Sequence, residues 1–368
     1  MKFLLFLFVS MLLSACTASS VVPSDSSPKP NDQVVAESRV TKPTIISIAA
    51  VGDVMLGTDY PDDKLPRDGS QLLAAASPFL QQVDIAFANM EGVMLDGGEP
   101  YKQCKDPKHC YLFRSPANYI EYFKTAGIDV VSLANNHARD FGEEGRTASM
   151  LALENAGLRH SGRLGDVARW QLKGRRVALI AFAPFANAND MLDLEQAHEL
   201  VAKLSTENDI VIVSIHAGAE GDDVLHLPFA NEMYRGEQRG DSVAFAHRVI
   251  DAGADLVIGH GPHVPRAMEL YRGRLIAYSL GNFCTYWGIK ISGLNGVAPL
   301  LSVNLAEDGR FLDGQIHSFK QARPEGSLLD PTQKAARLIA ELTREDFPHG
   351  FVHISESGKI ERLADPEH

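Results

Sequence analysis

Seven polar residues that can bind a metal ion or move a proton stand at the ends of five apolar runs in this chain of 368 residues. Each run is rich in β-branched and small apolar residues, a pattern typical of buried strands. Carboxylate and amide oxygens combined with imidazole nitrogens form a mixed ligand set that suits Zn, Mn or Fe. The expected chemistry is hydrolysis or group transfer assisted by one or two divalent metal ions. The seven residues are Asp53, Glu91, Asn136, His137, His216, His260 and His263.

Each of these residues also has a structural interpretation. Asp53 follows a glycine and could cap the next segment, and Asn136 could be a turn residue. His216 taken alone is more typical of a hydrogen-bonded structural histidine. His260 and His263 are stronger candidates, because the Gly-Pro pair between them has little structural need for imidazole on both sides. That all five runs end in this way favours one shared site, since ligands bind at the carboxyl ends of strands in α/β sheets.

Further polar residues stand close to this set. Arg139 and Asp140 follow His137 and could orient it or a substrate, or could form a surface ion pair instead. We take His137 and Asp140 as candidate catalytic residues and Arg139 as a candidate substrate-binding residue. Glu220 could contact substrate or hold a histidine N–H, and Asn282 ends a further strand on what we expect to be the same face.

The elements that must position these residues alternate between strands and helices, which favours a layered α/β fold. Hairpins expected over 266–283 and 300–319 indicate that the sheets are not purely parallel. We expect one domain over 44–300, with the hairpins and helix of 301–368 packed on it. The strands that end in the candidate ligands are expected over 44–53, 83–92, 128–137, 208–218 and 254–263. Helices are expected over 70–83, 116–127, 142–157, 194–207 and 241–253.

The N-terminus has the pattern of a targeting segment. Lys2 precedes an apolar run over 3–13, which is too short to span a bilayer and has the proportions of a signal peptide. Leu-Ser-Ala-Cys ending at Cys16 resembles the lipobox of bacterial lipoproteins, which implies cleavage after residue 15 and lipidation of Cys16. The alternative is an ordinary signal peptide. The Ser- and Pro-rich segment 16–43 is expected to be a disordered tether. Because lipidation of Cys16 would attach this tether to a membrane, the protein is expected to be anchored in the cell envelope.

Two more cysteines, Cys104 and Cys110, lie in a polar loop. In an oxidising compartment they are expected to form a local disulfide, and the alternative is a metal site with His109.

Composition excludes several classes of function. The net charge is −12 and no Lys/Arg-rich run is present, so nucleic acid is not an expected partner. The Gly-x-Ser-x-Gly, Gly-x-Gly-x-x-Gly and Gly-Lys-Ser/Thr motifs are also absent from the sequence, which argues against serine hydrolase, dinucleotide and P-loop chemistry.

Five motifs, in their order along the chain, resemble the bacterial CapA capsule-synthesis family. The resemblance covers 45–286 and implies a role in poly-γ-glutamate biosynthesis and export. The family is in turn similar to calcineurin-like metallophosphoesterases, which implies a four-layer α/β/β/α sandwich. The motifs are GDVMLG at 52–57, NMEG at 89–92, SLANNHARDFGEEG at 132–145, SIHAGAE at 214–220 and IGHGPHVPRAMELYRGRLIAYSLGNF at 258–283.

The resemblance implies roles for the candidate residues. Asp53 matches the first metal-binding aspartate, and Glu91 matches the position of a metal-bridging carboxylate. His137 matches a histidine that helps to protonate a leaving group. The remaining matches to metal ligands are Asn136, His216, His260 and His263.

The sequence departs from the phosphoesterase pattern in three places. Met55 stands where those enzymes have a histidine, and Glu91 stands where they usually have an aspartate. The last two histidines are three positions apart in this chain, at His260 and His263, rather than two. One of two metal positions is therefore expected to be short of a ligand.

Three hypotheses about function follow. The first is an envelope lipoprotein that acts on poly-γ-glutamate through a metal-dependent hydrolase or acyl-transfer site, together with capsule synthesis or export proteins. The second is a non-catalytic component that binds the anionic polymer during export. The third is a general metal-dependent phosphoesterase.

Overall fold

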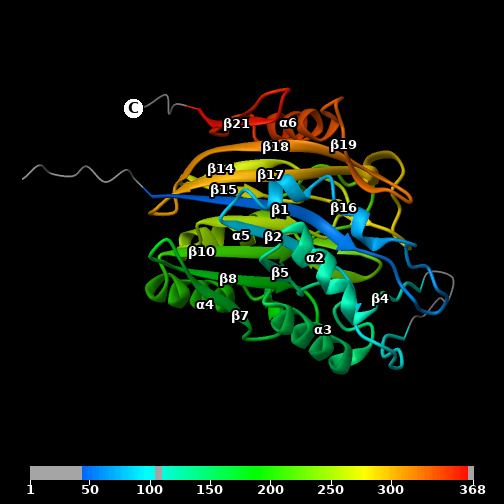
Figure 1. Ribbon diagram of the computed structural model, residues 1–368. Coiled ribbons are helices and arrows are strands. Elements are labelled where there is room, and N and C mark those ends of the chain that lie inside the picture. Colours follow the sequence, from blue (N-terminus) through cyan, green and yellow to red (C-terminus); the bar gives the residue numbers. More distant parts are fainter. Residues whose placement is uncertain (1–43, 104–109, 364–368) are drawn as a thin grey trace, which may run out of the picture. The chain divides into compact units, whose positions relative to one another are not determined.

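Asp53 lies near the end of β1 (Ile45–Met55), a strand inside the larger of two sheets. The computed structural model describes residues 44–103 and 110–363 (Figure 1). In pairing order, the strands of this ten-stranded sheet are β20 (Val352–Ile354), β21 (Lys359–Arg362), β18 (Phe311–Ala322), β17 (Val297–Ala306), β1, β2 (Ile85–Met90), β5 (Val130–Ser132) and β6 (Arg159–Ser161), with β16 (Asn282–Thr285) on β1 and β19 (Gly326–Leu329) on β18. β1 is parallel to β2 and β16 and antiparallel to β17, so the sheet is mixed, as expected.

A second, seven-stranded sheet carries two of the candidate histidines. Its strands are β14 (Met268–Tyr271), β15 (Arg274–Ala277), β13 (Leu256–His260), β10 (Ile210–His216), β8 (Arg175–Ala183) and β7 (Val167–Leu172) in pairing order, with β9 (Asn189–Asp190) on β8. β10 and β13 run parallel, and their register places His216 opposite His260. Two small sheets are formed by β3 (Val93–Met94) with β4 (Arg114–Ser115) and by β11 (Glu232–Tyr234) with β12 (Glu237–Gly240).

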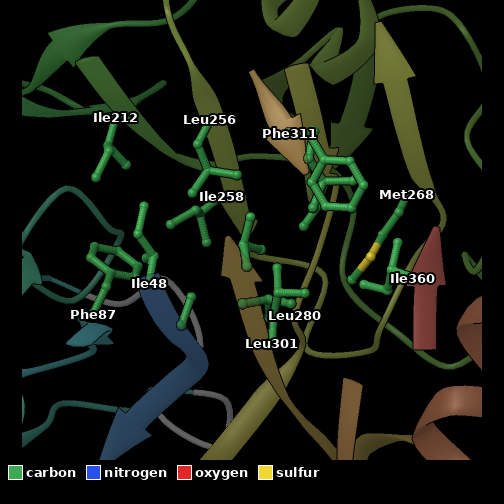
Figure 2. Close-up of a cluster of buried hydrophobic side chains, with 14 of the residues drawn as sticks. Ile48, Phe87, Ile212, Leu256, Ile258, Met268, Leu280, Leu301, Phe311 and Ile360 are labelled. Carbon is green, nitrogen blue, oxygen red and sulfur yellow. The ribbon is translucent and has the colours of Figure 1, made fainter. Parts of the chain in front are cut away.

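The two large sheets pack face to face over a common apolar core. Figure 2 shows side chains of both sheets meeting in it, among them Ile48 and Phe87 from the first sheet and Ile212 and Ile258 from the second. These side chains are at most 1% exposed, and full burial of such a side chain stabilises a fold by about 1.5–3 kcal/mol. A strand that is covered on both faces has apolar side chains at nearly every position. The strand sequences of this protein therefore lack an alternation of apolar and polar residues.

Helices cover the outer faces of both sheets. The outer face of the first sheet packs against α1 (Ser77–Leu80), α2 (Ile120–Ala126) and α3 (Gly142–Ala156). The outer face of the second packs against α4 (Leu194–Glu207) and α5 (Ser242–Asp251). The layers therefore follow the order α/β/β/α, and the predicted four-layer sandwich is confirmed.

Local sequence signals explain where most helices begin and end. The carboxylates of Asp193 and Asp241 accept hydrogen bonds from backbone N–H groups in the first turns of α4 and α5. α2 and α3 end at Gly127 and Gly157, whose φ angles of 95° and 83° are left-handed. The helix expected over 70–83 forms only in part, because Pro78 has no N–H to continue a helix from the preceding turn; α1 begins beside it instead.

The segment after residue 300 continues the same sheet and core. β17, β18, β20 and β21 belong to the larger sheet, and α6 (Lys334–Asp346) places Ala335, Ala336 and Ile339 in the core between the sheets. The expected signal peptide and tether, residues 1–43 with Cys16, lie outside the described residues. Within the described ranges, no helix combines the length and the apolar character needed to cross a membrane.

Candidate metal centre

The candidate ligands meet where strand ends of the two sheets face each other. In the first sheet, the register of β1 places Asp53 opposite Asn89 of β2 and Asn282 of β16. From the second sheet, the Nε2–H of His260 donates to the backbone carbonyl of Val51 across a distance of 3.2 Å. This contact ties the end of β13 to β1 and brings the two sets of strand ends together.

Asp53, Glu91 and His263 form the tightest group of metal-binding side chains among the described residues. One donor atom of each lies within 4.8 Å of the others, and all three side chains are buried. The Nδ1 of His263 is 3.1 Å from Oδ2 of Asp53, and its Nε2 is 3.7 Å from Oε1 of Glu91. His263 has a left-handed φ of 60°, a strained conformation that is typical of functional sites.

Several buried polar atoms around this group have no hydrogen-bond partner among the described residues. They include both carboxylate oxygens of Glu91, both ring nitrogens of His216 and Nδ1 of His260. Oδ1 of Asn136 also has no partner there, but Asn136 lines a second, smaller cavity. Buried polar atoms in folded proteins are nearly always hydrogen-bonded, and these atoms are all metal donors. The residues present therefore fit a divalent cation held by nitrogen and oxygen ligands.

The pKa values of the two carboxylates, Glu91 and Asp53, also favour a bound cation at this centre. Burial, together with the negative charge of Asp53, raises the pKa of Glu91 well above its usual value. Burial also opposes ionisation of Asp53, but the hydrogen bond and the charge of His263 outweigh burial and lower the pKa of Asp53 to about 2. Two buried carboxylates so close together repel, and a cation between them would relieve that repulsion.

The histidines divide into two kinds. Burial lowers the pKa of His216 well below the usual value and lowers that of His260 in the same direction, so both rings are neutral and able to bind a metal. For His263, burial is outweighed by the charges of Glu91 and Asp53, and the pKa rises to about 10. In the metal-free protein, a proton on His263 thus supplies the positive charge that the carboxylates require.

His137 stands beside the metal-binding group and is held by Asp140. Its Nδ1 lies 2.7 Å from Oδ2 of Asp140, and its Nε2 lies 4.0 Å from Oε1 of Glu91. The same Asp140 oxygen accepts the backbone N–H of Phe113, whose ring packs 4.3 Å from the imidazole. Burial lowers the pKa of His137, while Asp140 opposes this shift. The pair has the arrangement of a proton-transfer histidine with an orienting carboxylate.

A cavity of about 650 Å³ opens onto this centre. Glu220 lines this cavity, and its carboxylate lies 3.9 Å from Nε2 of His263 and 3.0 Å from Nη2 of Arg239. Three cations also reach the cavity from separate loops. One of these cations, Lys290, is paired with Asp222 at 2.6 Å. The charged and titratable residues that line the cavity are His137, Glu220, Asp222, His263, Arg235, Lys290 and Arg323.

Arg139 and Asn282, the other two predicted substrate-binding residues, do not line the large cavity. Arg139 does not line this cavity; its Nε lies 2.7 Å from Glu143, and it lines a second, smaller cavity with Asn136. Asn282 is fully buried, with Oδ1 2.9 Å from Nδ1 of His263 and Nδ2 donating to the His263 carbonyl. This geometry favours a positioning role for Asn282.

Sequence reasoning missed Asn89 as a member of the site. Its side-chain amide Nδ2 donates to Oδ1 of Asp53 at 2.8 Å, and Nδ2 of Asn135 donates to the side-chain oxygen Oδ1 of Asn89 at 3.1 Å. The signal was present, since Asn89 and Asn135 both stand at strand ends. Lys290 and Arg323 of the cavity carried no such signal, because they are isolated in loops.

Met55 stands at the position where the sequence predicts that a metal ligand is missing. It lies within β1, two residues after Asp53, and its sulfur accepts the backbone N–H of Gly57 at 3.2 Å. A thioether replaces imidazole there, so that position supplies no nitrogen ligand. Cys110 is disulfide-bonded, whereas Cys104, its predicted partner, lies outside the described residues, so the pairing stays a prediction.

Comparison with known proteins identifies the family. The model of the family described as "Bacterial capsule synthesis protein PGA_cap" matches residues 47–286, more than half of the chain. The chain belongs to the PGA_cap family. All the candidate metal ligands lie inside the match, whereas Lys290 and Arg323 of the cavity wall lie beyond it. The resemblance inferred from the motifs is confirmed.

Relatives of this chain are identical to it at about a quarter to a third of the aligned positions. Capsule biosynthesis protein CapA of Bacillus anthracis is 28% identical over 250 residues, which cover 65% of this chain and 59% of that protein. PGA biosynthesis protein CapA of Bacillus subtilis (strain 168) is 26% identical over 256 residues, covering 65% and 63%. A probable polyglutamine synthesis accessory protein of Mycobacterium tuberculosis is 34% identical over 230 residues, covering 54% and 55%. The chain therefore matches less than two thirds of the length of each relative.

Among solved structures, a putative 5'-nucleotidase from Staphylococcus aureus aligns with 83% of this chain and 58% of its own, at 14% identity and a TM-score of 0.42.

Proposed function

We propose that this protein is an envelope-anchored accessory protein of poly-γ-glutamate capsule synthesis that acts on the acidic polymer at a divalent-metal site, by hydrolysis or acyl transfer. PGA_cap membership and the capsule-related names of the relatives support the pathway. The observation that carries the chemistry is the convergence of Asp53, Glu91 and His263 beside a cavity that both cationic and acidic side chains line. The anchor is the lipidated Cys16 expected from the sequence.

A metal ion, with Mn, Zn or Fe as the candidates, would be held by Asp53, Glu91 and His263. The chemistry that such an ion supplies is polarisation of a carbonyl or phosphoryl oxygen and activation of water near neutral pH. His216, His260 and Asn136 offer the further donors whose atoms lack partners among the described residues.

The protein's own side chains then have separate tasks. Arg235, Lys290 and Arg323 line the cavity, where they neutralise carboxylates of the polymer. Nε2 of His137 takes the proton that the attacking water or other nucleophile releases and delivers it to the leaving group, and Asp140 keeps the ring in place through the 2.7 Å contact at Nδ1. This arrangement explains how a chain with a net charge of −12 can bind an anionic substrate.

The test uses the full chain, loaded with Mn or Zn, and poly-γ-glutamate or a chromogenic phosphate ester as substrate. We expect metal to bind and new amino termini to appear from the polymer. Glu91→Gln keeps the side-chain shape but removes the charge, and should lower the rate by roughly 100-fold or more. Glu121→Gln, on the exposed face of α2, is the matched control. Turnover of the phosphate ester alone would assign the protein as a general phosphoesterase.

A second candidate function is favoured by Met55, which leaves one metal position of the phosphoesterase pattern without its histidine. In that case the protein binds and guides the polymer without cleaving it. His137→Gln separates the two candidates, since it removes the proton-transfer group and leaves the cavity cations in place. Normal capsule production by the His137→Gln strain would favour the polymer-binding role; loss of capsule with polymer binding retained would favour catalysis.

A further inference from the structure

A second cavity, of about 170 Å³, lies next to the metal centre on the other side of the turn that carries His137. His137 lines the large cavity, whereas its neighbours Asn136 and Ala138 line the small one. Phe185 forms another part of the small cavity's wall, and its ring lies 6.0 Å from that of His216. The small cavity therefore borders the metal centre at two places.

The charges around this small cavity do not balance. Three guanidinium groups share the single carboxylate of Glu143: Arg139 through Nε at 2.7 Å, Arg163 through Nη2 at 3.2 Å, and Arg146 through Nη2. Across 44–103 and 110–363, Glu143 is the only carboxylate paired with any of these three arginines. The group carries an excess of positive charge, which favours an additional anion.

Arg146 is the least solvated member of this group. Its side chain lines the small cavity and is only 2% exposed, and its Nε has no hydrogen-bond partner in the part of the chain that the structure describes. Its Nη1 donates to the Asn187 carbonyl at 2.9 Å. A buried guanidinium with an unused donor is costly unless an acceptor is supplied, and this cavity is the space from which one can come.

A fourth cation and an apolar wall complete the cavity. The Nζ of Lys102 lies 3.3 Å from the Asn136 carbonyl and 3.4 Å from Oδ1 of Asp140, at the cavity's edge. Leu133, Ala138 and Phe185 supply apolar surface opposite the cations. The pocket thus has one charged side and one apolar side.

We propose that this small cavity is a binding site for a carboxylate carried on a short aliphatic chain. The planar guanidinium groups of Arg139 and Arg146 match the two oxygens of a carboxylate, and the apolar wall suits the methylene groups that carry it. Inorganic phosphate fits this pocket less well, because some of its oxygens would face the apolar wall. The volume is several times the roughly 30 Å³ of one water molecule, enough for such a group.

This pocket adds a carboxylate subsite beside the metal centre. Its use for a glutamyl side chain of the polymer rests on the proposed function, whereas its affinity for a carboxylate does not.

The test measures binding of glutarate and of inorganic phosphate to the full chain by calorimetry at constant ionic strength. Metal is first removed with a chelator, and the chelator is removed by dialysis, so that neither can account for binding. Arg139→Gln and Lys102→Gln change partly exposed side chains and should leave the fold intact. Arg163→Gln is the matched control, because Arg163 pairs with the same Glu143 but does not line the cavity.

We expect saturable binding of one glutarate per chain, tighter than that of phosphate. Arg139→Gln should weaken it by roughly ten-fold or more, and Lys102→Gln by several-fold, since each removes a charged contact. Arg163→Gln should change it by less than about two-fold. Absence of saturable glutarate binding, tighter binding of phosphate, or equal losses in Arg139→Gln and Arg163→Gln would each overturn the proposal. Glutarate binding in a protein that fails to process the polymer would leave this site standing while the proposed function falls.

Discussion

The pKa values of the buried histidines in this protein shift in opposite directions. Burial lowers each pKa, and contacts with carboxylates raise some of them above the usual value. Outside the metal centre, the clearest case is His160 on β6, which lies between two carboxylates. Its Nδ1 is 2.8 Å from Asp166, and its Nε2 is 3.1 Å from Glu154. Burial disfavours the charged ring, but the two contacts outweigh burial and raise the pKa of His160 above its usual value.

A pH-dependent contribution to stability follows from His160. Because its pKa is raised on folding, the charged ring stabilises the fold fully below the unfolded value of about 6.5, and this stabilisation is lost as pH rises through the higher folded value. We expect His160→Gln to lower the free energy of unfolding by about 1–3 kcal/mol at pH 5.5 and by much less at pH 9.

Denaturant unfolding of both proteins across this pH range measures the difference directly. His353→Gln, at an exposed position on β20, is the control for the loss of an imidazole and should change the free energy of unfolding little at either pH. An equal loss of stability at pH 5.5 and pH 9 would mean that the ring contributes by packing alone.

At the scale of elements, two glycines allow the strands to approach closely next to the metal ligands. A Cβ on Gly52 would lie 2.0 Å from the Gly281 carbonyl oxygen, and a Cβ on Gly259 would lie 2.0 Å from the Tyr278 carbonyl oxygen. These glycines directly precede Asp53 and His260. The close approach of the backbones therefore determines where both ligands stand.

We expect Gly259→Ala to displace the end of β13, since backbone atoms cannot yield to the new methyl group. The free energy of unfolding should fall by about 1–3 kcal/mol, as for an overpacked core. Metal affinity should fall by roughly 10- to 100-fold, as when support of a ligand is lost. Metal titration and denaturant unfolding measure the two effects.

Gly157→Ala is the control for this variant. Gly157 has a φ of 83° but open space around it, so an alanine there strains the backbone at the end of α3 without touching the site. Its stability should fall by about 1–2 kcal/mol while metal affinity stays unchanged. Unchanged metal affinity in Gly259→Ala as well would show that His260 is not placed by this contact.

At the scale of the whole molecule, the C-terminal segment is part of the core. β17 pairs along most of β1, and the side chains of α6 that face inward join the core between the two sheets. We expect a chain ending after Gly296 to be insoluble or unfolded, because it leaves β1 without its antiparallel neighbour. A chain ending after Leu363 should fold normally. Circular dichroism and limited proteolysis distinguish these outcomes; a folded, soluble chain ending at Gly296 would show that the segment is an independent appendage.

The proposed membrane anchor is a second prediction at this scale. Cys16→Ala removes the thiol that lipidation requires, so the protein should move from the membrane fraction to the soluble fraction of the envelope. Ser24→Ala, in the same segment, should leave the distribution unchanged. Retention of Cys16→Ala in the membrane fraction would rule out Cys16 as the anchor.

The sequence by itself determined the kinds of residues at the site and the edge of the sheet on which they stand. Polar residues after apolar runs identify strand ends, and parallel strands present their carboxyl ends on one side. Asp53, Glu91 and His263 could therefore be assigned together before their geometry was known. The order of the motifs also determined the family, and through it the four layers. Pro78 shows the limit, since the apolar spacing around it suggested one long helix where two short ones form.

Only the tertiary structure decided which side chains share a cavity. Arg139 is two residues from His137, yet the turn between them directs the two side chains into different cavities. Arg323 reaches the large cavity from beyond the family match, through a contact with the Thr285 carbonyl that no local pattern encodes. The physical reason is that strand periodicity specifies a face and an end, whereas side-chain rotamers and the packing of one sheet on another depend on contacts between distant segments.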